Sequence, residues 1–272
     1  MIEIDPDDCK RHNSPIMTRI GQSTIDPLEA KKFGQLAEDW WDEQGPMRSL
    51  HQINPLRIGY IRKMIMAHFP KIADLHLLDA GCGAGIACEP MARLGADVTG
   101  IDAAKENITA AEAHAGLMGL DIDYRCMAVE ELAEERPESF DVILSLEVME
   151  HVANLPGYIK GLERLLKPQG LLIFSTPIRN LLSWLTLIVL AEHVTGLIPK
   201  GTHDWDKFLR REDLEPLFSA HGLMLIDLRG VRFSILSRDF CISDNLRINK
   251  TGPGINMTGP DINMIGTART KR

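Results

Sequence analysis

Glu147, Glu150 and His151 place two carboxylates and an imidazole on a short stretch of the chain. They follow the apolar run 140–146, which predicts a buried strand. If a helical turn begins at Glu147, the other two side chains lie three and four positions further on and share its face. Such a group can bind a divalent metal ion, and the nitrogen among its oxygen ligands leaves zinc and manganese open beside magnesium. Two interpretations compete with a metal: a metal-free site with His151 as general base, and a stretch where Glu150 is solvated and His151 ends a helix.

Three glycines at alternate positions, Gly81, Gly83 and Gly85, form the second chemical feature. An apolar run precedes them and a helix-like segment follows. This order predicts a strand, a tight turn and a helix, which begin a doubly wound nucleotide fold. A dinucleotide-binding turn requires G-x-G-x-x-G, but Ile86 stands where the third glycine belongs. The turn therefore disfavours a dinucleotide cofactor and a dehydrogenase.

Two acids flank this turn. Asp79 stands two residues before the first glycine, where it can hold a cationic amine or orient the loop. Asp102 ends the next predicted strand, where it can accept hydrogen bonds from both hydroxyls of a ribose. The backbone at Gly81 and Gly83 can approach a ligand closely because no Cβ intervenes. S-adenosylmethionine has a ribose, an amino-acid tail and a sulfonium, and it has no phosphate. We therefore expect it as the cofactor.

Strand-like and helix-like segments alternate through the middle of the chain with short connections. This order predicts an α/β fold with a parallel sheet and helices on both faces. The expected strands are 75–80, 97–101, 122–127, 140–146, 170–175 and 223–228, with 240–242 as a candidate seventh. The expected helices are 84–94, 105–117, 129–135, 155–166 and 211–220. Glu147 then lies at the carboxyl edge of the sheet, where ligands bind in such folds.

The N-terminal part should be a flexible lead over 1–24, followed by helices within 25–68. Asp26 is a good cap for the first of these helices. The adjacent Trp40 and Trp41 cannot share one face of a helix. One of them can therefore face a pocket, while the ordinary alternative packs both in a core.

Asn54 and Pro55 predict a second helix start, as the cap and the first-turn residue. This start places Arg57 in the first turn, where a cation is unfavourable for the helix dipole. Arg57 is therefore either a residue with a function elsewhere or a solvated surface arginine.

Two further segments break the alternation of strands and helices. The insertion 178–203 carries the apolar run 181–190, which is about half the length needed to span a bilayer. With Trp184 and flanking cations, it can lie in a membrane interface or pack as a dry lid. Beyond residue 250, TGPGINM is repeated almost unchanged as TGPDINM, and this Gly-, Pro- and Asn-rich duplicate predicts a disordered tail over 251–272. The folded domain should then occupy 25–250.

Composition narrows the class of protein. The chain has 272 residues, 44% of them hydrophobic, which is enough for one large α/β domain. Its net charge of -8 argues against the basic face of a general nucleic-acid binder, so we expect no nucleic-acid partner. Five cysteines without a CxxC pair indicate reduced thiols in a cytosolic-type compartment. The polar N-terminus lacks the apolar core of a secretory signal.

Taken together with the runs 140–147 and 166–174, these features resemble the class I methyltransferases over about residues 75–230. Further motifs narrow the resemblance to the ubiquinone biosynthesis O-methyltransferases, over about residues 25–249. These motifs are Trp40-Trp41-Asp42 and the runs 50–57, 148–152 and 199–204.

The resemblance implies a Rossmann-like methyltransferase sheet of seven mostly parallel strands, the last of them antiparallel. It implies methylation of ring hydroxyls of polyprenylated catechol-type intermediates in ubiquinone biosynthesis. Both O-methylation steps are included, on 2-polyprenyl-6-hydroxyphenol and on 3-demethylubiquinol. By the same resemblance Arg57, Gly81, Asp102 and Leu146 contact S-adenosylmethionine, with Arg57 on the methionine carboxylate. A metal at Glu147, Glu150 and His151 would then be magnesium.

The resemblance also implies a substrate that resides in the bilayer. We therefore expect a cytoplasmic protein, peripheral on the inner face of the cytoplasmic membrane and close to other quinone-synthesis enzymes. One alternative is a class I methyltransferase that acts on another small phenol, an RNA or a protein. The other is a non-catalytic cofactor-binding subunit of a quinone-synthesis complex, which the intact Glu147, Glu150 and His151 disfavour.

Overall fold

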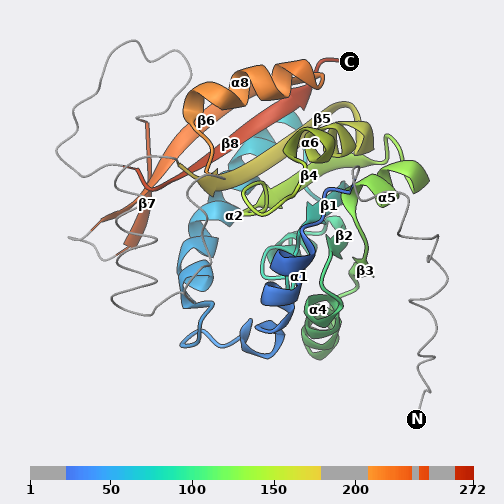
Figure 1. Cartoon of the computed structure of the whole chain (residues 1–272), viewed down its shortest axis with the longest axis vertical. Coiled ribbons are helices and arrows are strands. Elements are labelled where there is room, and N and C mark those ends of the chain that lie inside the picture. The colour runs from blue at the N-terminus through green and yellow to red at the C-terminus, as the bar shows by residue number, and fades with distance from the viewer. Residues whose placement is uncertain (1–22, 179–207, 235–238, 245–260) are drawn as a thin grey trace.

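The computed structural model describes residues 23–178, 208–234, 239–244 and 261–272. Within them, one sheet carries eight strands in the order β3-β2-β1-β4-β5-β8-β6-β7 (Figure 1). The strands are β1 (His76–Ala80), β2 (Asp97–Asp102), β3 (Asp123–Cys126), β4 (Phe140–Leu146), β5 (Leu166–Pro177), β6 (Leu223–Ser234), β7 (Asp239–Ser243) and β8 (Asn263–Thr270).

Helices cover both faces of this sheet, as the sequence predicted (Figure 1). They are α1 (Pro27–Gly34), the short 3₁₀ helix η3 (Ala37–Asp39), α2 (Arg48–His68), α3 (Cys88–Arg93), α4 (Lys105–Met118), α5 (Val129–Glu135), α6 (Leu155–Leu165) and α8 (Arg211–Ala220). Side chains of α5, α6 and α8 form one buried cluster, and those of α2, α3 and α4 form another. On β1, Leu78 belongs to the first cluster and Leu77 to the second, because successive strand residues point to opposite faces.

The order of the strands reverses at β1. This strand pairs in parallel with β2 on one side and with β4 on the other, so that Asp79 is in register with both Gly100 and Leu144. In open α/β sheets, ligands bind outside the carboxyl ends of the strands at such a reversal. The fold therefore brings the glycine turn after β1 close to Asp102, at the end of β2, and Leu146, at the end of β4.

The C-terminal segment overturns the prediction of a disordered tail. β8 runs antiparallel between β5 and β6, and Gly266 is in register with Phe174 on one side and Leu228 on the other. Residues 251–260 lie outside the described residues. The repeat was misleading because its Gly-Pro part ends at Pro260, and the strand that follows contains no proline and includes β-branched residues.

The count of seven strands is also wrong, since the described residues form eight. The predicted segment 240–242 lies in β7, which pairs antiparallel with β6 at the edge of the sheet. The last strand along the chain is antiparallel to its neighbours, as expected, but this strand is β8.

The predicted helix start at Asn54 is wrong as well, since α2 begins at Arg48 and passes through Pro55. The side chain of Asn54 does not cap a helix, because its Nδ2 donates a 2.9 Å hydrogen bond to the carbonyl of Ile86. Arg57 consequently lies inside α2, where it is only 6% exposed. It is not a solvated surface arginine.

Apart from residue 178, the predicted insertion 178–203 lies outside the described residues, as do residues 1–22 of the predicted lead. In the part of the chain that the structure describes, no helix combines the length and the apolar composition needed to cross a membrane.

Candidate functional site

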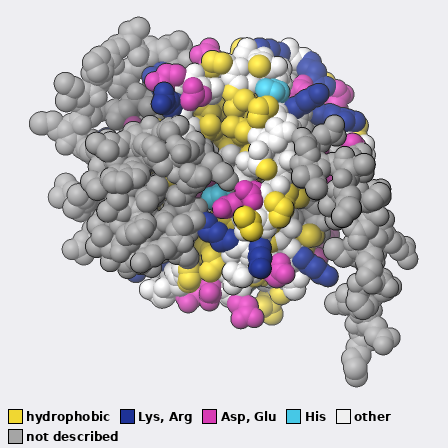
Figure 2. Space-filling model, viewed as in Figure 1, with side chains coloured by type: hydrophobic (Ala, Val, Ile, Leu, Met, Phe, Trp, Pro, Cys, Tyr) yellow, Lys and Arg dark blue, Asp and Glu magenta, His cyan; other side chains and the backbone are white. Residues whose placement is uncertain are grey.

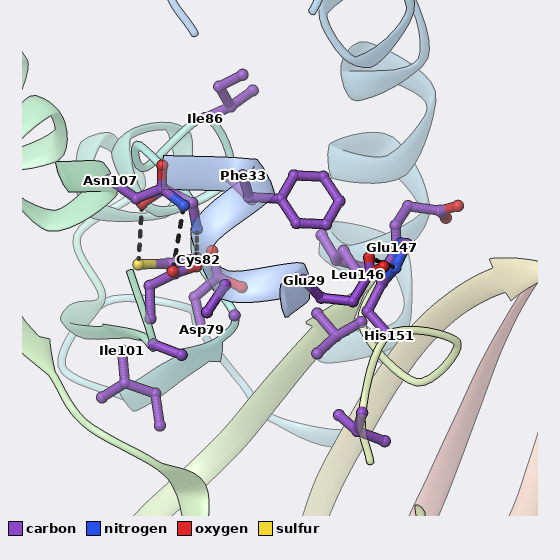
Figure 3. Close-up of a pocket in the computed structure, with 18 of the residues that line it drawn as sticks. Glu29, Phe33, Asp79, Cys82, Ile86, Ile101, Asn107, Leu146, Glu147 and His151 are labelled. Atoms are coloured by element: carbon purple, nitrogen blue, oxygen red, sulfur yellow. Dashed lines mark hydrogen bonds and ion pairs between the residues drawn. The ribbon is translucent and has the colours of Figure 1, made fainter. Parts of the chain in front are cut away.

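A cavity of about 260 Å³ lies at the carboxyl edge of the sheet, between the glycine turn, the end of β4 and the N-terminal helices. Its lining includes every site residue predicted from the sequence: Arg57, Gly81, Asp102, Leu146, Glu147, Glu150 and His151. Figure 3 shows Leu146, Glu147 and His151 at one end of this pocket and Asp79 and Cys82 at the other. The fold thus gathers all of these residues in one place.

The glycine turn brings backbone to the cavity wall because its glycines adopt left-handed conformations. The φ angle is +81° at Gly81 and +54° at Gly83. A Cβ on Gly81 would lie 2.5 Å from Cγ2 of Val148, and one on Gly83 would lie 2.3 Å from the Trp40 ring. Both the backbone conformation and the close approach therefore require glycine at these positions.

Asp102 is held by three donors. Its Oδ2 accepts from the backbone N–H of Gly83 at 3.0 Å. Its Oδ1 accepts from the N–H of Ala104 at 2.8 Å and from Nδ2 of Asn107 at 3.2 Å. Burial raises the pKa of Asp102 above its ordinary value, and the three hydrogen bonds oppose that rise. The carboxylate therefore fixes the glycine turn and still has lone pairs for a ligand.

Asp79 lies deeper than Asp102 and is 2% exposed. The thiol of Cys88 donates to its Oδ2 at 3.2 Å. Burial raises the pKa of Asp79 to about 7, and the nearby charge of Asp102 acts in the same direction. Asp79 is thus buried at the base of the site and tied to Cys88 of α3. This position favours a role in orienting the loop over a role in holding a cationic amine.

Arg57 and Glu147 form an ion pair in the wall of the cavity. Nη2 of Arg57 lies 2.8 Å from Oε1 of Glu147. The same carboxylate accepts from Oγ of Ser175 at 2.6 Å and from Nδ2 of Asn263 at 2.9 Å to each oxygen. Glu147 has a positive φ of 56°, which turns the chain at the end of β4. Glu147 thus joins α2, β5 and β8.

Glu150 and His151 point in different directions from Glu147. Glu150 is buried, and its Oε2 accepts from Oγ1 of Thr176 at 3.0 Å. Burial, together with the charge of Glu147, raises the pKa of Glu150 to about 7. Nδ1 of His151 lies 2.8 Å from Oε2 of Glu29 on α1, and its Nε2 lies 3.9 Å from Oε1 of Glu150.

The three residues do not form a ready metal site. Residues 147–151 form a turn without helical structure, so the shared helix face expected from their spacing is absent. Glu147 is occupied by Arg57, and His151 by Glu29. Among the described residues, no group of three or more His, Cys, Asp or Glu side chains is arranged to hold a metal ion.

The cavity wall does carry polar atoms that suit an organic ligand. Four buried atoms on lining residues have no hydrogen-bond partner in the described part of the chain: Nε1 of Trp40, Nε of Arg57, Oδ1 of Asn107 and Oε1 of Glu150. Two are donors and two are acceptors. An unsatisfied buried polar group is costly, so these four atoms indicate that a ligand with both kinds of group belongs in the cavity.

The two tryptophans have different roles. Trp40 lines the cavity and packs against the glycine turn. Trp41 stacks on His114, with ring centroids 3.5 Å apart, and donates to the carbonyl of Ala84 at 3.1 Å. One of the pair therefore faces a pocket, as one of the two alternatives predicted.

Sequence reasoning missed four residues of the site: Glu29, Asn107, Ser175 and Asn263. Asn107 lies in the first turn of α4, five residues after Asp102, and this short spacing was the only signal for it. The other three reach the site only through the packing of α1, β5 and β8.

Comparisons with known proteins identify the fold and the family of this chain. A family model described as "Methyltransferase domain" matches residues 78–174. The ubiquinone biosynthesis O-methyltransferase of Cereibacter sphaeroides is 46% identical, over 84% of this chain and 95% of the relative. The protein of the same name from Ruegeria pomeroyi is 45% identical, over 84% of this chain and 94% of the relative.

Solved structures share the fold at low identity. A magnesium protoporphyrin IX methyltransferase from Synechocystis with bound SAM has a TM-score of 0.58 and 15% identity, covering 89% of this chain and 95% of that one. With identity above 40% across most of both chains, the relatives show the family. The chain therefore belongs to the ubiquinone biosynthesis O-methyltransferase family of S-adenosylmethionine-dependent methyltransferases.

Proposed function

We propose that this enzyme methylates ring hydroxyls of polyprenylated catechol-type intermediates at both O-methylation steps of ubiquinone biosynthesis. Its substrates are 2-polyprenyl-6-hydroxyphenol and 3-demethylubiquinol. Family membership supports the reaction. The location of the site rests on one observation: the lining of this cavity carries four buried polar atoms that have no hydrogen-bond partner among the described residues. On the face shown in Figure 2, Lys and Arg side chains are scattered among Asp and Glu, which suits a small-molecule substrate better than a nucleic acid.

Arg57, Gly81, Asp102 and Leu146 are the residues that we assign to the cofactor. S-adenosylmethionine supplies an electrophilic methyl group on a sulfonium, which a phenolic oxygen attacks in line. Gly81 presents backbone without a Cβ, and Asp102 retains free lone pairs for hydroxyl groups. Nε of Arg57, which has no hydrogen-bond partner in the part of the chain that the structure describes, can donate to an anionic group, and Leu146 adds an apolar wall.

We assign to His151 the removal of the phenolic proton. A free phenol has a pKa of about 10, so the acceptor oxygen needs a base in order to become a good nucleophile near neutral pH. His151 lines the cavity, and its Nε2 lies 3.9 Å from Oε1 of Glu150, an atom that has no hydrogen-bond partner in the described residues. These two atoms offer a place for the hydroxyl of the acceptor.

A transfer assay tests this assignment. With labelled S-adenosylmethionine, the wild type should methylate both named acceptors. His151→Ala should lower kcat by about a hundredfold, within the usual contribution of a general base. His68→Ala removes an exposed histidine at the end of α2 and serves as the matched control, with unchanged kcat. Equal kcat in both variants would remove His151 from the chemistry, and transfer only to other phenols would refute the substrate assignment.

A divalent ion at Glu147, Glu150 and His151 stays a prediction. The present donor set does not fit an ion, since Arg57 and Glu29 occupy two of the three side chains. We therefore derive no step through a metal. Stripping the enzyme with EDTA and titrating with magnesium, manganese and zinc decides the question. Full activity without added metal rejects the ion, whereas strict dependence on one metal requires Glu147 to exchange its partners.

We also propose that the enzyme acts at the membrane surface, where its polyprenylated substrate resides. The sequence of 181–190, with Trp184 and Leu187, supports this proposal. Liposome flotation of the wild type against a Trp184→Glu and Leu187→Glu double variant tests it. The wild type should float and the double variant should not. Equal flotation of the two proteins contradicts a membrane role for this run.

A further inference from the structure

We propose that Glu29 is a positioning residue for His151, which it holds in the tautomer that offers the lone pair of Nε2 to the cavity. This inference rests on the proposed role of His151 as the base. Glu29 lies on α1, far from His151 in the sequence, yet its Oε2 is 2.8 Å from Nδ1 of the ring. Figure 3 shows the two side chains directed toward each other at the same end of the pocket.

The charge of Glu29 sets the direction of this hydrogen bond. An ionised carboxylate has only acceptor atoms, so with Glu29 ionised the proton between the two residues belongs to Nδ1 of His151. In a neutral imidazole the other nitrogen then carries a lone pair. That nitrogen, Nε2, lies 3.9 Å from Oε1 of Glu150, which is too far for a hydrogen bond. The tautomer fixed by Glu29 is therefore the one that can accept a proton from a hydroxyl in the cavity.

The ring is held from a second side by Phe33, also on α1. The two ring centroids are 4.9 Å apart with an interplanar angle of 79°, an edge-to-face contact. The side chain of His151 is 15% exposed and that of Glu29 is 22% exposed, so the pair is largely shielded from water. One short helix thus supplies both the acceptor and the aromatic contact that orient the imidazole.

The segment before α1 is anchored to the body of the domain. The backbone N–H and the hydroxyl of Thr24 donate to Glu130 at 2.8 and 2.5 Å. The carbonyl of Thr24 accepts from the N–H of Ala153 at 2.9 Å, two residues beyond His151. Asp26 caps α1 through the N–H of Leu28. Glu29 is therefore held beside His151 by a fixed element. Its Oε2 also lies 3.6 Å from Nζ of Lys32 in the same helix, a longer contact than the 2.8 Å to His151.

The test uses Glu29→Gln, which keeps the shape of the side chain, and the control Glu38→Gln, an exposed change of the same kind in η3. Glu29→Gln should lower kcat by about tenfold or more, while the KM values of cofactor and acceptor stay within about twofold, because positioning of a base acts on the transition state. Glu38→Gln should leave both parameters unchanged. Adding Glu29→Gln to His151→Ala should lower kcat no further, because Glu29 acts only through His151, which the first change has already removed.

A readout independent of turnover comes from NMR of full-length enzyme labelled with ¹⁵N-histidine, with the His151 signals assigned by their loss in His151→Ala. At neutral pH the wild type should show a protonated Nδ1 and an unprotonated Nε2. In Glu29→Gln these signals should move toward a mixture of tautomers. Unchanged signals in the variant, or a wild-type ring protonated on both nitrogens, overturn the inference about Glu29. If His151→Ala itself keeps full kcat, the role of His151 as base fails instead, whatever the NMR shows.

Discussion

The guanidinium of Arg57 and the carboxylate of Glu147 form an ion pair, with Nη2 2.8 Å from Oε1, that ties the middle of α2 to the end of β4. Both groups line the cavity, and the side chain of Arg57 is only 7% exposed. Ser175 and Asn263 complete the shell of the carboxylate. Changes at any member of this network should therefore affect the cavity as well as stability.

Arg57→Met should weaken binding of S-adenosylhomocysteine by about tenfold or more and lower the free energy of unfolding by about 1–3 kcal/mol, because it leaves a partly buried carboxylate with one donor fewer. Isothermal titration and urea unfolding measure the two effects. Arg62→Met, at an exposed position of the same helix, is the matched control and should change neither. Equal affinity in the two variants would show that Arg57 has no role in the cofactor site.

Gly83→Ala should lower both the free energy of unfolding and the affinity for S-adenosylhomocysteine, because the added Cβ would lie 2.3 Å from the Trp40 ring. Gly119→Ala provides the matched control, since Gly119 has a similar φ of +64° but nothing within 4 Å of its added Cβ. Both variants should lose about 1 kcal/mol of unfolding free energy for a left-handed alanine. Only Gly83→Ala should lose further stability, measured by urea unfolding, and bind S-adenosylhomocysteine more weakly, measured by titration. If the two variants have the same stability and the same affinity, the close approach of Gly83 to the Trp40 ring has no role in the site.

Asn263→Ala should reduce kcat or cofactor affinity, because Nδ2 of Asn263 donates to both oxygens of Glu147. The repeat offers an internal control, since Asn256 occupies the same place in its first copy. Asn256→Ala should behave like the wild type in the transfer assay. A loss of activity in both variants, or in neither, would mean that the second copy has no special place in the site.

Asp79→Asn should change how stability depends on pH. The pKa of Asp79 is about 7 in the folded enzyme, above that of an unfolded aspartate, so the folded state binds more protons between these two values. The wild type therefore loses stability as pH rises through that window, and the neutral asparagine does not. Relative to the wild type, the variant should gain stability, on the order of a few kcal/mol, from about pH 4 to about pH 8.

Urea unfolding at several pH values measures this gain. Asp121→Asn, which changes an exposed carboxyl, is the control and should follow the wild-type curve. A constant difference between Asp79→Asn and the wild type at every pH would contradict the raised pKa.

The sequence by itself determined the order of strands and helices up to β7, the glycine turn and seven of the residues that line the cavity. These features depend on local rules. Hydrophobic periodicity marks the elements, Gly81 and Gly83 mark a turn that only glycine can make, and parallel strands place their carboxyl ends on one edge. Arg57, Gly81, Asp102, Leu146, Glu147, Glu150 and His151 therefore line the same cavity.

Only the tertiary structure decided which groups these residues face. Glu29 is 122 positions from His151, and Asn263 is 116 positions from Glu147. No periodicity connects residues that far apart, because their contact depends on how α1 and β8 pack against the sheet. The position of β8 between β5 and β6 could not be predicted from the sequence for the same reason. Beside a glycine- and proline-rich repeat, this strand is recognised only when β5 and β6 are seen to satisfy its backbone hydrogen bonds.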